Sequence, residues 1–427
     1  MKIKKAVGVA SLLLCALYLA ACSGDVAATQ KTGAYTAIAP AETPVPSPEP
    51  TTSPTSVPTS SPTSMPTPSP TPEPTPTPPS SAEVSFAFTG DLMFHRSLLS
   101  ASRSDGKYDF TPVFEKVAPN ILGADFAVAN LEAPVYDPQK STLGEFSFAA
   151  PPEAITDFAA AGFDVFTTAN NHATDQGAAG LSNTIDVIRK AGLKVTGTWR
   201  DQAEREEILM LEHNGVKIAI LAYGRKSLSS GFPKGMGSNL WSMDRLDDMT
   251  AAVQRAKAAG ADAVIVSIHF GNEYTFAPSS QQKKTVDAMR AAGAIAVIGH
   301  HPHVLQPMFM DADSKFFAAY SLGNIVTTTS TTQRQFAAIL KLTVRKDLVT
   351  GDVAISGLSY VPTWTRMLKG ADGKARLRVY DIRQALSDCE AGVNPEIPKK
   401  YLKELTNGYE WIRKTLGTEC LEPVQVK

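Results

Sequence analysis

Six of the seven histidines lie in four short stretches where an apolar run gives way to glycine, asparagine or polar residues. The stretches span residues 89–95, 169–172, 268–273 and 299–303, and a fifth of the same kind, 130–132, ends in an acid. Only His213 lies elsewhere. Because imidazole is a common metal ligand and the usual acid–base group near neutral pH, this confinement indicates one assembled site.

The side chains that these stretches offer include Asp91, Glu132, Asn171 and up to five histidines. Mixed oxygen and nitrogen donors suit Zn, Mn or Fe better than calcium or a thiolate-preferring metal. The set is large enough for two ions that share a bridging carboxylate. Two ions about 3.5–4 Å apart can activate a water and stabilise both oxygens of a phosphoryl transfer. A histidine that binds neither ion can then protonate the leaving group.

Seven short apolar runs predict strands that are covered on both faces. They span residues 84–88, 126–129, 165–168, 216–223, 263–268, 294–298 and 316–320. Helical patterns at 181–191, 244–259 and 281–292 lie between them, and each is followed by a capping glycine, Gly192, Gly260 or Gly293. This alternation predicts a layered α/β domain.

The candidate side chains come at or just after the ends of these runs. In α/β sheets, ligands bind beyond the carboxyl ends of the strands, so we expect the candidates to gather at one edge of the sheet structure. A single buried histidine bonded to the backbone would be ordinary. Several histidines at strand ends, beside acids and asparagines, favour a metal site.

Residues 1–21 have the pattern of an export signal, with a basic start at Lys2, Lys4 and Lys5 and then an apolar run. The run falls short of a membrane span, which needs about 20 apolar residues. Residues 19–22, Leu-Ala-Ala-Cys, resemble a bacterial lipobox. That resemblance implies cleavage before Cys22 and its lipidation; the alternative is an ordinary signal peptide with an incidental cysteine.

Residues 22–82 form a linker without patterned apolar sequence, and residues 44–79 hold half of the 30 prolines. Such a tract cannot bury a core and favours extended polyproline geometry. At about 3.1 Å per residue it can span on the order of 100 Å. We expect a disordered stalk that lifts the domain off the membrane into the cell wall, with binding to proline-recognising partners as the alternative.

Globular composition begins at about Glu83. We divide the folded part into a metal-site domain, residues 83–350, and a C-terminal extension, 351–427, that packs on the same domain. The net charge of -1 argues against a nucleic-acid partner. Export permits a disulfide between Cys389 and Cys420, although the sequence does not show whether they meet.

Six motifs occur in one order along the chain: Thr-Gly-Asp-Leu-Met at 89–93, Asn-Leu-Glu at 130–132, Asn-Asn-His at 170–172, His-Phe-Gly-Asn-Glu-Tyr at 269–274, His-Pro-His at 301–303 and Tyr-Ser-Leu-Gly-Asn at 320–324. Together they resemble the CapA family of capsule (poly-γ-glutamate) biosynthesis proteins, from about residue 84 to about 326. That family is similar to the calcineurin-like metallophosphoesterases, which implies a four-layer α/β/β/α sandwich.

The resemblance implies two divalent metal ions and a role for each motif. The metal ligands would be Asp91, the bridging Glu132, Asn171, His269, and His301 and His303, one for each ion. His172 resembles the general acid beside the ligand asparagine. We expect His300 to point elsewhere, because neighbouring side chains diverge in extended chain. We expect Asp175 to be a loop residue or a helix cap.

The first motif departs from the wider phosphoesterase pattern, Asp-x-His, because Leu92 and Met93 follow Asp91. Either one ion lacks a protein ligand, or His95 from the following loop replaces the missing histidine. Glu273 has no place among the metal ligands. We expect it to contact one of those ligands or the substrate.

The lipobox and the family resemblance together imply a lipid-anchored protein on the extracellular face of the membrane that acts in the synthesis, export or anchoring of an anionic envelope polymer. Its activity would be metal-dependent hydrolysis of phosphoesters or a related bond. The alternative is a non-catalytic accessory or polymer-binding module of a membrane synthase complex. The missing Asp-x-His histidine favours this alternative, whereas the pair of Asn171 and His172 favours hydrolysis.

Overall fold

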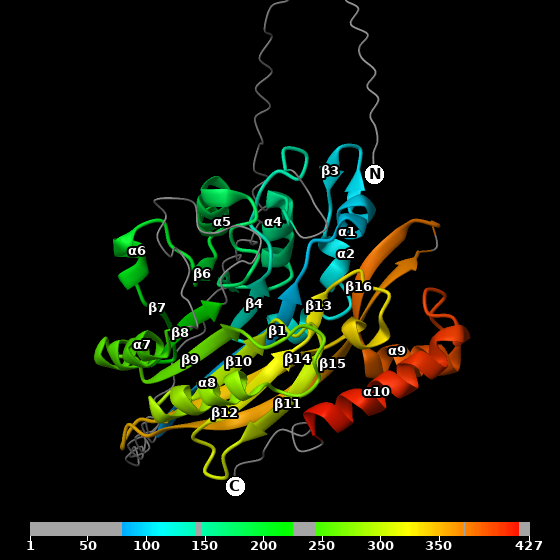
Figure 1. Cartoon of the computed structure of the whole chain (residues 1–427). Coiled ribbons are helices and arrows are strands. Elements are labelled where there is room, and N and C mark those ends of the chain that lie inside the picture. Colours follow the sequence, from blue (N-terminus) through cyan, green and yellow to red (C-terminus); the bar gives the residue numbers. More distant parts are fainter. Residues whose placement is uncertain (1–78, 142–146, 225–244, 371, 418–427) are drawn as a thin grey trace, which may run out of the picture. The chain divides into compact units, whose positions relative to one another are not determined.

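A computed structural model describes residues 79–141, 147–224, 245–370 and 372–417 (Figure 1). The predicted signal, Cys22, almost all of the stalk and Cys420 lie outside these residues. Cys389 is buried, and its pairing with Cys420 stays a prediction. Within the described ranges, no helix has both the length and the apolar character that a membrane crossing requires.

The larger sheet has the strand order β16-β15-β14-β1-β4-β5-β6, with the short β13 beside β1. β1, β4, β5 and β6 run parallel, whereas β14, β15 and β16 add an antiparallel half. The bounds are β1 Ser81–Leu92, β4 Phe126–Leu131, β5 Val165–Thr167, β6 Lys194–Thr196, β13 Asn324–Val326, β14 Phe336–Asp347, β15 Val353–Lys369 and β16 Ala375–Asp381.

The smaller sheet has the order β11-β12-β10-β9-β8-β7, parallel in its four inner strands and antiparallel at both edges. Its strands are β7 Leu209–His213, β8 Val216–Gly224, β9 Ala263–His269, β10 Ala296–His300, β11 Leu305–Met310 and β12 Phe317–Leu322. Every residue of β9 is buried. This burial explains why the strand is a nearly continuous apolar run rather than an alternating one.

The helices follow or connect these strands. They are α1 Arg96–Ala101, α2 Thr111–Phe114, α3 Ala118–Leu122, α4 Pro152–Ala160, α5 Gly177–Lys190, α6 Gln202–Glu206, α7 Leu246–Ala258, α8 Ser280–Ala291, α9 Ile382–Ala391 and α10 Leu402–Leu416, with 3-10 turns η1 Thr332–Gln335 and η2 Lys399–Tyr401. A two-stranded hairpin joins β2 Arg103–Ser104 to β3 Lys107–Tyr108.

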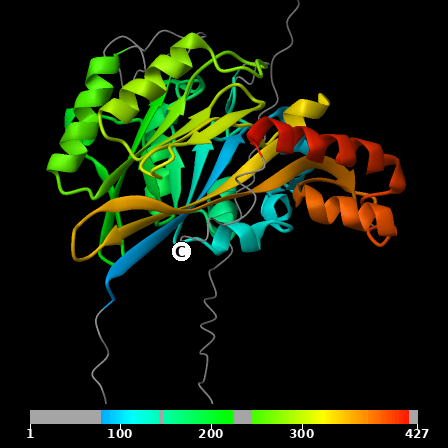
Figure 2. The ribbon, with the colours of Figure 1, turned by 90° about the horizontal axis from the view of Figure 1, so that it is seen from below.

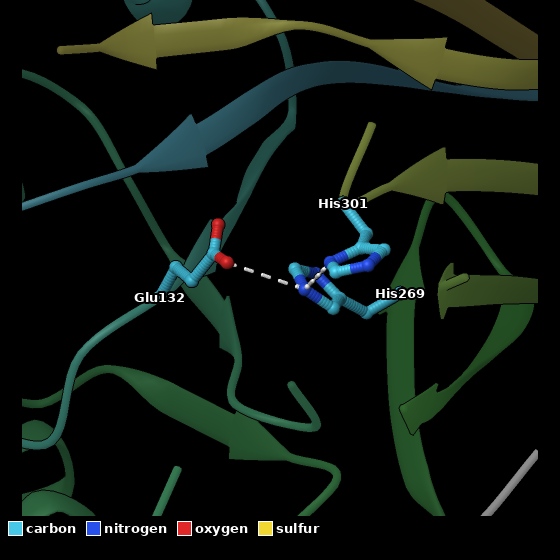
Figure 3. Close-up of side chains that lie close together, drawn as sticks. All are labelled: Glu132, His269 and His301. Atoms are coloured by element: carbon cyan, nitrogen blue, oxygen red, sulfur yellow. Dashed lines mark hydrogen bonds and ion pairs between the residues drawn. The ribbon is translucent and has the colours of Figure 1, made fainter. Parts of the chain in front are cut away.

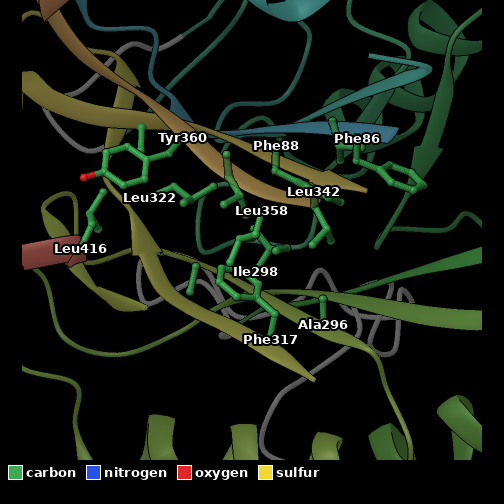
Figure 4. Close-up of a cluster of buried hydrophobic side chains, with 14 of the residues drawn as sticks. Phe86, Phe88, Ala296, Ile298, Phe317, Leu322, Leu342, Leu358, Tyr360 and Leu416 are labelled. Atoms are coloured by element: carbon green, nitrogen blue, oxygen red, sulfur yellow. The ribbon is translucent and has the colours of Figure 1, made fainter. Parts of the chain in front are cut away.

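Three apolar layers hold the elements together. Side chains such as Phe86, Ile298 and Leu342 fill the space between the two sheets (Figure 4). On the outer face of the larger sheet, Phe114 of α2 and Phe158 of α4 belong to a second core. The outer face of the smaller sheet packs against α7 and α8 in a third core, and Figure 2 shows these two helices along one side of the strands.

The order of layers is therefore helix, sheet, sheet, helix, and the predicted four-layer fold is confirmed. Each of the seven predicted runs overlaps a strand, and the three predicted helices correspond to α5, α7 and α8. The sequence patterns did not indicate β14, β15 and β16, which complete the larger sheet. α9 and α10 contribute Ile382 and Leu405 to the core between the sheets.

Candidate metal centre

The candidate residues meet at the carboxyl ends of the central parallel strands. Asp91 lies at the end of β1, Glu132 directly follows β4, and His269 is the last residue of β9. Asn171 and His172 lie in the turn after β5, and His301 and His303 lie in the turn after β10. The convergence that the strand ends predicted is present, although these residues come from five separate segments.

Gly90 lets Asp91 reach this position. A Cβ on Gly90 would lie 2.0 Å from the carbonyl oxygen of Gly323, on the adjacent chain. The amide of Asp91 donates to that same carbonyl at 2.9 Å, and the register between β1 and β4 shifts between Thr89 and Asp91. The close approach of the two backbones therefore turns the Asp91 side chain toward the centre.

One group of ligand atoms surrounds Nε2 of His269 (Figure 3). This nitrogen lies 2.6 Å from Oδ1 of Asn171, 3.0 Å from Nδ1 of His301 and 3.3 Å from Oε1 of Glu132. A single ring hydrogen can be donated to only one of these three acceptors at full strength. The same four atoms together are a suitable donor set for a borderline transition metal.

A second group consists of Asp91, Glu132 and His303, whose ligand atoms lie within 4.8 Å of one another. Nδ1 of His303 lies 3.4 Å from Oδ2 of Asp91, and its Nε2 lies 3.7 Å from Oε1 of Glu132. Glu132 belongs to both groups, whereas His301 belongs to the first and His303 to the second. This is the arrangement that a bridging carboxylate requires, while the ligand roles themselves stay predictions.

Glu132 provides the test of whether a cation fits. Its side chain is fully buried, and neither carboxylate oxygen has a hydrogen-bond partner among the described residues. Burial raises the pKa of this carboxyl to about 8. A buried carboxylate that accepts no hydrogen bond is strongly destabilising unless positive charge compensates it. Divalent cations supply that charge, so the residues present fit a metal centre.

Asp91 is held as an anion by a fuller set of partners. Asn130 donates to its Oδ1 at 2.7 Å, and the amide of His301 donates to its Oδ2 at 3.1 Å. Burial alone would raise the pKa of Asp91, but His300 and His303 more than offset this and hold it well below its usual range. The sequence did not assign a role to Asn130, which is the residue that aims this carboxylate.

The expectation that His300 points elsewhere is wrong. Its side chain is buried, and Nδ1 lies 3.4 Å from Oδ1 of Asp91. His300 pairs with His269 across β10 and β9, and paired residues of parallel strands share a face. The strand ends there, and His301 adopts a positive φ of 96°. Side-chain alternation therefore stops at His301, and both neighbours face the centre.

Asp175 lies in the loop before α5, as expected, but it is not the cap of that helix, and its side chain contacts a candidate site residue. Oδ2 of Asp175 lies 2.8 Å from Nδ1 of His172 and accepts the amide hydrogen of Phe148 at 2.7 Å. The N-cap of α5 is instead Gln176. Because a carboxylate only accepts, Nδ1 of His172 carries hydrogen and Nε2 is left for the site. The Phe148 ring covers His172 at 4.4 Å between centroids.

His95 and Glu273 lie at the margin of the centre. The His95 ring meets the edge of Phe148, and His95 is absent from the three groups of ligand atoms found in the described chain. Burial lowers its pKa to about 4, so the ring is neutral. Glu273 is exposed and lies with His301 and His303 in a third group. Met93, at the position of the missing histidine, packs in the outer core of the larger sheet.

Comparison with known proteins connects this centre to one family. The family described as "Bacterial capsule synthesis protein PGA_cap" matches residues 85–329. The "Capsule biosynthesis protein CapA" of Bacillus anthracis is 30% identical over 269 residues, which cover 62% of this chain and 64% of that protein. The "PGA biosynthesis protein CapA" of Bacillus subtilis (strain 168) is 29% identical over 267 residues, 62% of this chain and 68% of the relative.

The aligned part of this chain thus spans slightly less than two thirds of the Bacillus anthracis relative. Among solved structures, the calcineurin-like phosphoesterase YfkN from Bacillus subtilis aligns with a TM-score of 0.41 at 17% identity, over 78% of this chain and 99% of that chain.

Proposed function

Because the chain belongs to the bacterial capsule synthesis protein family, we propose that it acts in the synthesis, export or anchoring of an anionic envelope polymer. Its place would be the extracellular face of the cell membrane, held by a lipid on Cys22 and raised by the stalk. The names of two relatives refer to capsule and PGA biosynthesis, which supports a polymer of the poly-γ-glutamate type.

The proposed activity is metal-dependent hydrolysis of a phosphoester or a related bond. The observation that carries it is the pair of ligand groups that share Glu132, whose buried carboxylate accepts no hydrogen bond from the described residues. Two divalent ions, Mn, Zn or Fe, supply Lewis-acid charge and an activated water in sites of this kind. Asp91, Glu132 and His303 would hold one ion, and Glu132, Asn171, His269 and His301 the other.

His172 is the proposed general acid. Oδ2 of Asp175 accepts the hydrogen on Nδ1, and in the imidazolium form of the ring Nε2 carries a second proton. That second proton can pass from Nε2 to the leaving oxygen of the substrate. Phe148 packs over the ring and fixes its plane, so the acid is oriented before the substrate binds.

The test of the proposal is hydrolysis of an aryl phosphate by the full chain loaded with Mn, Zn or Fe. Wild type and His172→Ala should hold the same amount of metal, whereas only wild type should turn over. Equal turnover in the two proteins would remove the general-acid role. Absence of bound metal from wild type under metal-replete conditions would remove the centre itself.

A second candidate is a non-catalytic accessory module that binds polymer or a membrane synthase partner. Met93 favours it, because a thioether in the outer core replaces the imidazole of the Asp-x-His pattern. This leaves Asp91, Glu132 and His303 as the ligands of one ion. Metal binding without turnover of any phosphoester would support this candidate over the first.

A further inference from the structure

Arg334 lies beside the metal centre without an acidic partner. It belongs to the 3-10 turn η1 and is partly buried. Within the described parts of the chain, no carboxylate lies at ion-pair distance from its guanidinium. Arg334 instead makes a cation–π contact, in which its guanidinium carbon lies 3.3 Å from the centroid of the Tyr274 ring. A cation that is fixed in place and left unpaired next to a candidate active site needs an explanation.

Tyr274 connects this arginine to the centre. The Tyr274 ring lies 5.9 Å from the ring of His303, between centroids, and 44% of the residue is exposed. Its backbone has a φ of 61°, which is unfavourable for a bulky residue. The conformation is fixed because its amide donates to the carbonyl of Pro302 at 2.7 Å. Strain of this kind, where it is held by specific contacts, clusters at functional sites.

Asn324 ties the same two parts together through its amide. Its Oδ1 lies 2.9 Å from Nδ1 of His303, and its Nδ2 donates to the carbonyl of Arg334 at 3.4 Å. One side chain therefore orients a candidate metal ligand and holds the backbone of the arginine. Arg334 is placed relative to the centre by two independent routes, one through Tyr274 and one through Asn324.

We propose that Arg334, stacked on Tyr274, is an anion-binding subsite that holds a carboxylate or phosphate group of the substrate next to the metal centre. Stacking covers one face of the guanidinium and leaves its edge N–H groups free to donate. These groups match the two oxygens of a carboxylate or phosphate in a bidentate manner. The inference rests on the proposed function, because it assigns the substrate of that centre to the anionic class.

The alternative is that Arg334 only stabilises its turn by the cation–π contact. The two roles differ in their dependence on charge and ligand. A structural arginine would affect unfolding or metal content, whereas a binding arginine would affect the affinity for anions at constant metal content. A test of binding rather than turnover also keeps the subsite separate from the question of whether hydrolysis occurs.

The experiment uses the full chain carrying His172→Ala and loaded with Mn²⁺, so that binding is measured without turnover. Isothermal titration would compare two probes, a γ-linked glutamate oligomer and phenyl phosphate. The variants are Arg334→Gln and Arg334→Lys. The matched control is Arg413→Gln, whose guanidinium lies 5.8 Å from the Tyr409 ring on α10. Metal content and urea unfolding would be measured for each protein.

We expect Arg334→Gln to weaken binding of at least one probe about tenfold, the size of effect typical for a charge-assisted bidentate contact. The affinity of Arg334→Lys should lie between those of the parent and Arg334→Gln, because lysine keeps the charge but lacks the planar guanidinium. Arg413→Gln should bind both probes as tightly as the parent. Loss with the oligomer alone assigns the subsite to carboxylates, and loss with phenyl phosphate alone assigns it to phosphate. Unchanged affinity for both probes in folded, metal-bearing Arg334→Gln or Arg334→Lys would overturn the proposal.

Discussion

Nδ1 of His172 lies 2.8 Å from Oδ2 of Asp175, whose side chain is only 1% exposed. The two residues are three apart in sequence, in the turn between β5 and α5. Asp175 also accepts the Phe148 amide hydrogen, so the pair is held from a second segment of the chain. This geometry makes Asp175 the residue that positions the proposed general acid.

Asp175→Asn should lower kcat for an aryl phosphate by about 10²-fold, within the range for general acid–base catalysis. The amide keeps the shape but removes the carboxylate charge beside the Nδ1–H of His172. The KM and the metal content should change little. Asp164→Asn is the matched control, because Asp164 also accepts a backbone amide, that of Ala127 at 2.8 Å, without touching a histidine. Rates for Asp175→Asn equal to wild type would contradict the assignment.

Glu132→Gln should remove metal from both ligand groups, because Glu132 is common to them. Wild type should hold roughly two transition ions per chain under metal-replete conditions, and Glu132→Gln distinctly fewer. His303→Ala, which belongs to one of the two groups around Glu132, should leave the other ion in place. Elemental analysis of the purified proteins gives the metal content of wild type, Glu132→Gln and His303→Ala. Wild-type metal content in Glu132→Gln would show that this carboxylate does not bridge.

His300→Ala should weaken metal affinity about tenfold without changing the number of ions bound at saturation. Its ring faces Asp91 rather than lying within the ligand groups, and loss of such a supporting contact typically costs about 10–100-fold in affinity. Competition with a chelator gives the measurement. His213→Ala serves as control, because His213 pairs with Asp125 at 3.1 Å and stands apart from the centre. Equal affinities of His300→Ala and wild type would show that this contact is dispensable.

The location of the centre was predictable because each ligand candidate follows an apolar strand, and strand ends of a parallel sheet meet at one edge. Asp175 and His300 were not, for two different reasons. The role of Asp175 depends on the Phe148 amide, 27 positions away, and no local pattern encodes that contact. His300 shares the face of its strand partner His269, and the positive φ of His301 brings that neighbouring ring to the same side, which strand periodicity does not anticipate.

The fold, too, was predictable where a strand carries a clear local pattern and not where it lacks one. The parallel strands β8, β9 and β10 are buried on both faces and appear as apolar runs, so their prediction succeeded. β15 mixes buried and partly exposed residues along 17 positions, and its pattern did not stand out. The contact of Arg334 with Tyr274 joins segments that are 60 positions apart, and only the folded chain brings them together.

Gly90→Ala should lower the free energy of unfolding by about 1–3 kcal/mol, the usual range for overpacking. The new Cβ would lie 2.0 Å from a backbone oxygen of Gly323, which cannot move aside as a flexible side chain can. Relief of this clash would separate the two backbones and displace Asp91, so metal affinity should fall as well. Urea unfolding with and without metal gives both quantities. Glu83→Ala, at an exposed position of the same strand, should stay within about 0.5 kcal/mol of wild type.

Cys22→Ala should abolish lipidation and release the protein from membranes in the native host. The expectation rests on the residues before Cys22, which resemble a lipobox, and on an apolar run that falls short of the roughly 20 residues of a membrane span. Membrane fractionation with metabolic labelling by a palmitate analogue measures both effects. Ser23→Ala, beside the modified position, should remain labelled and sedimenting. Membrane retention of an unlabelled Cys22→Ala protein would instead indicate that the apolar segment stays uncleaved and serves as the anchor.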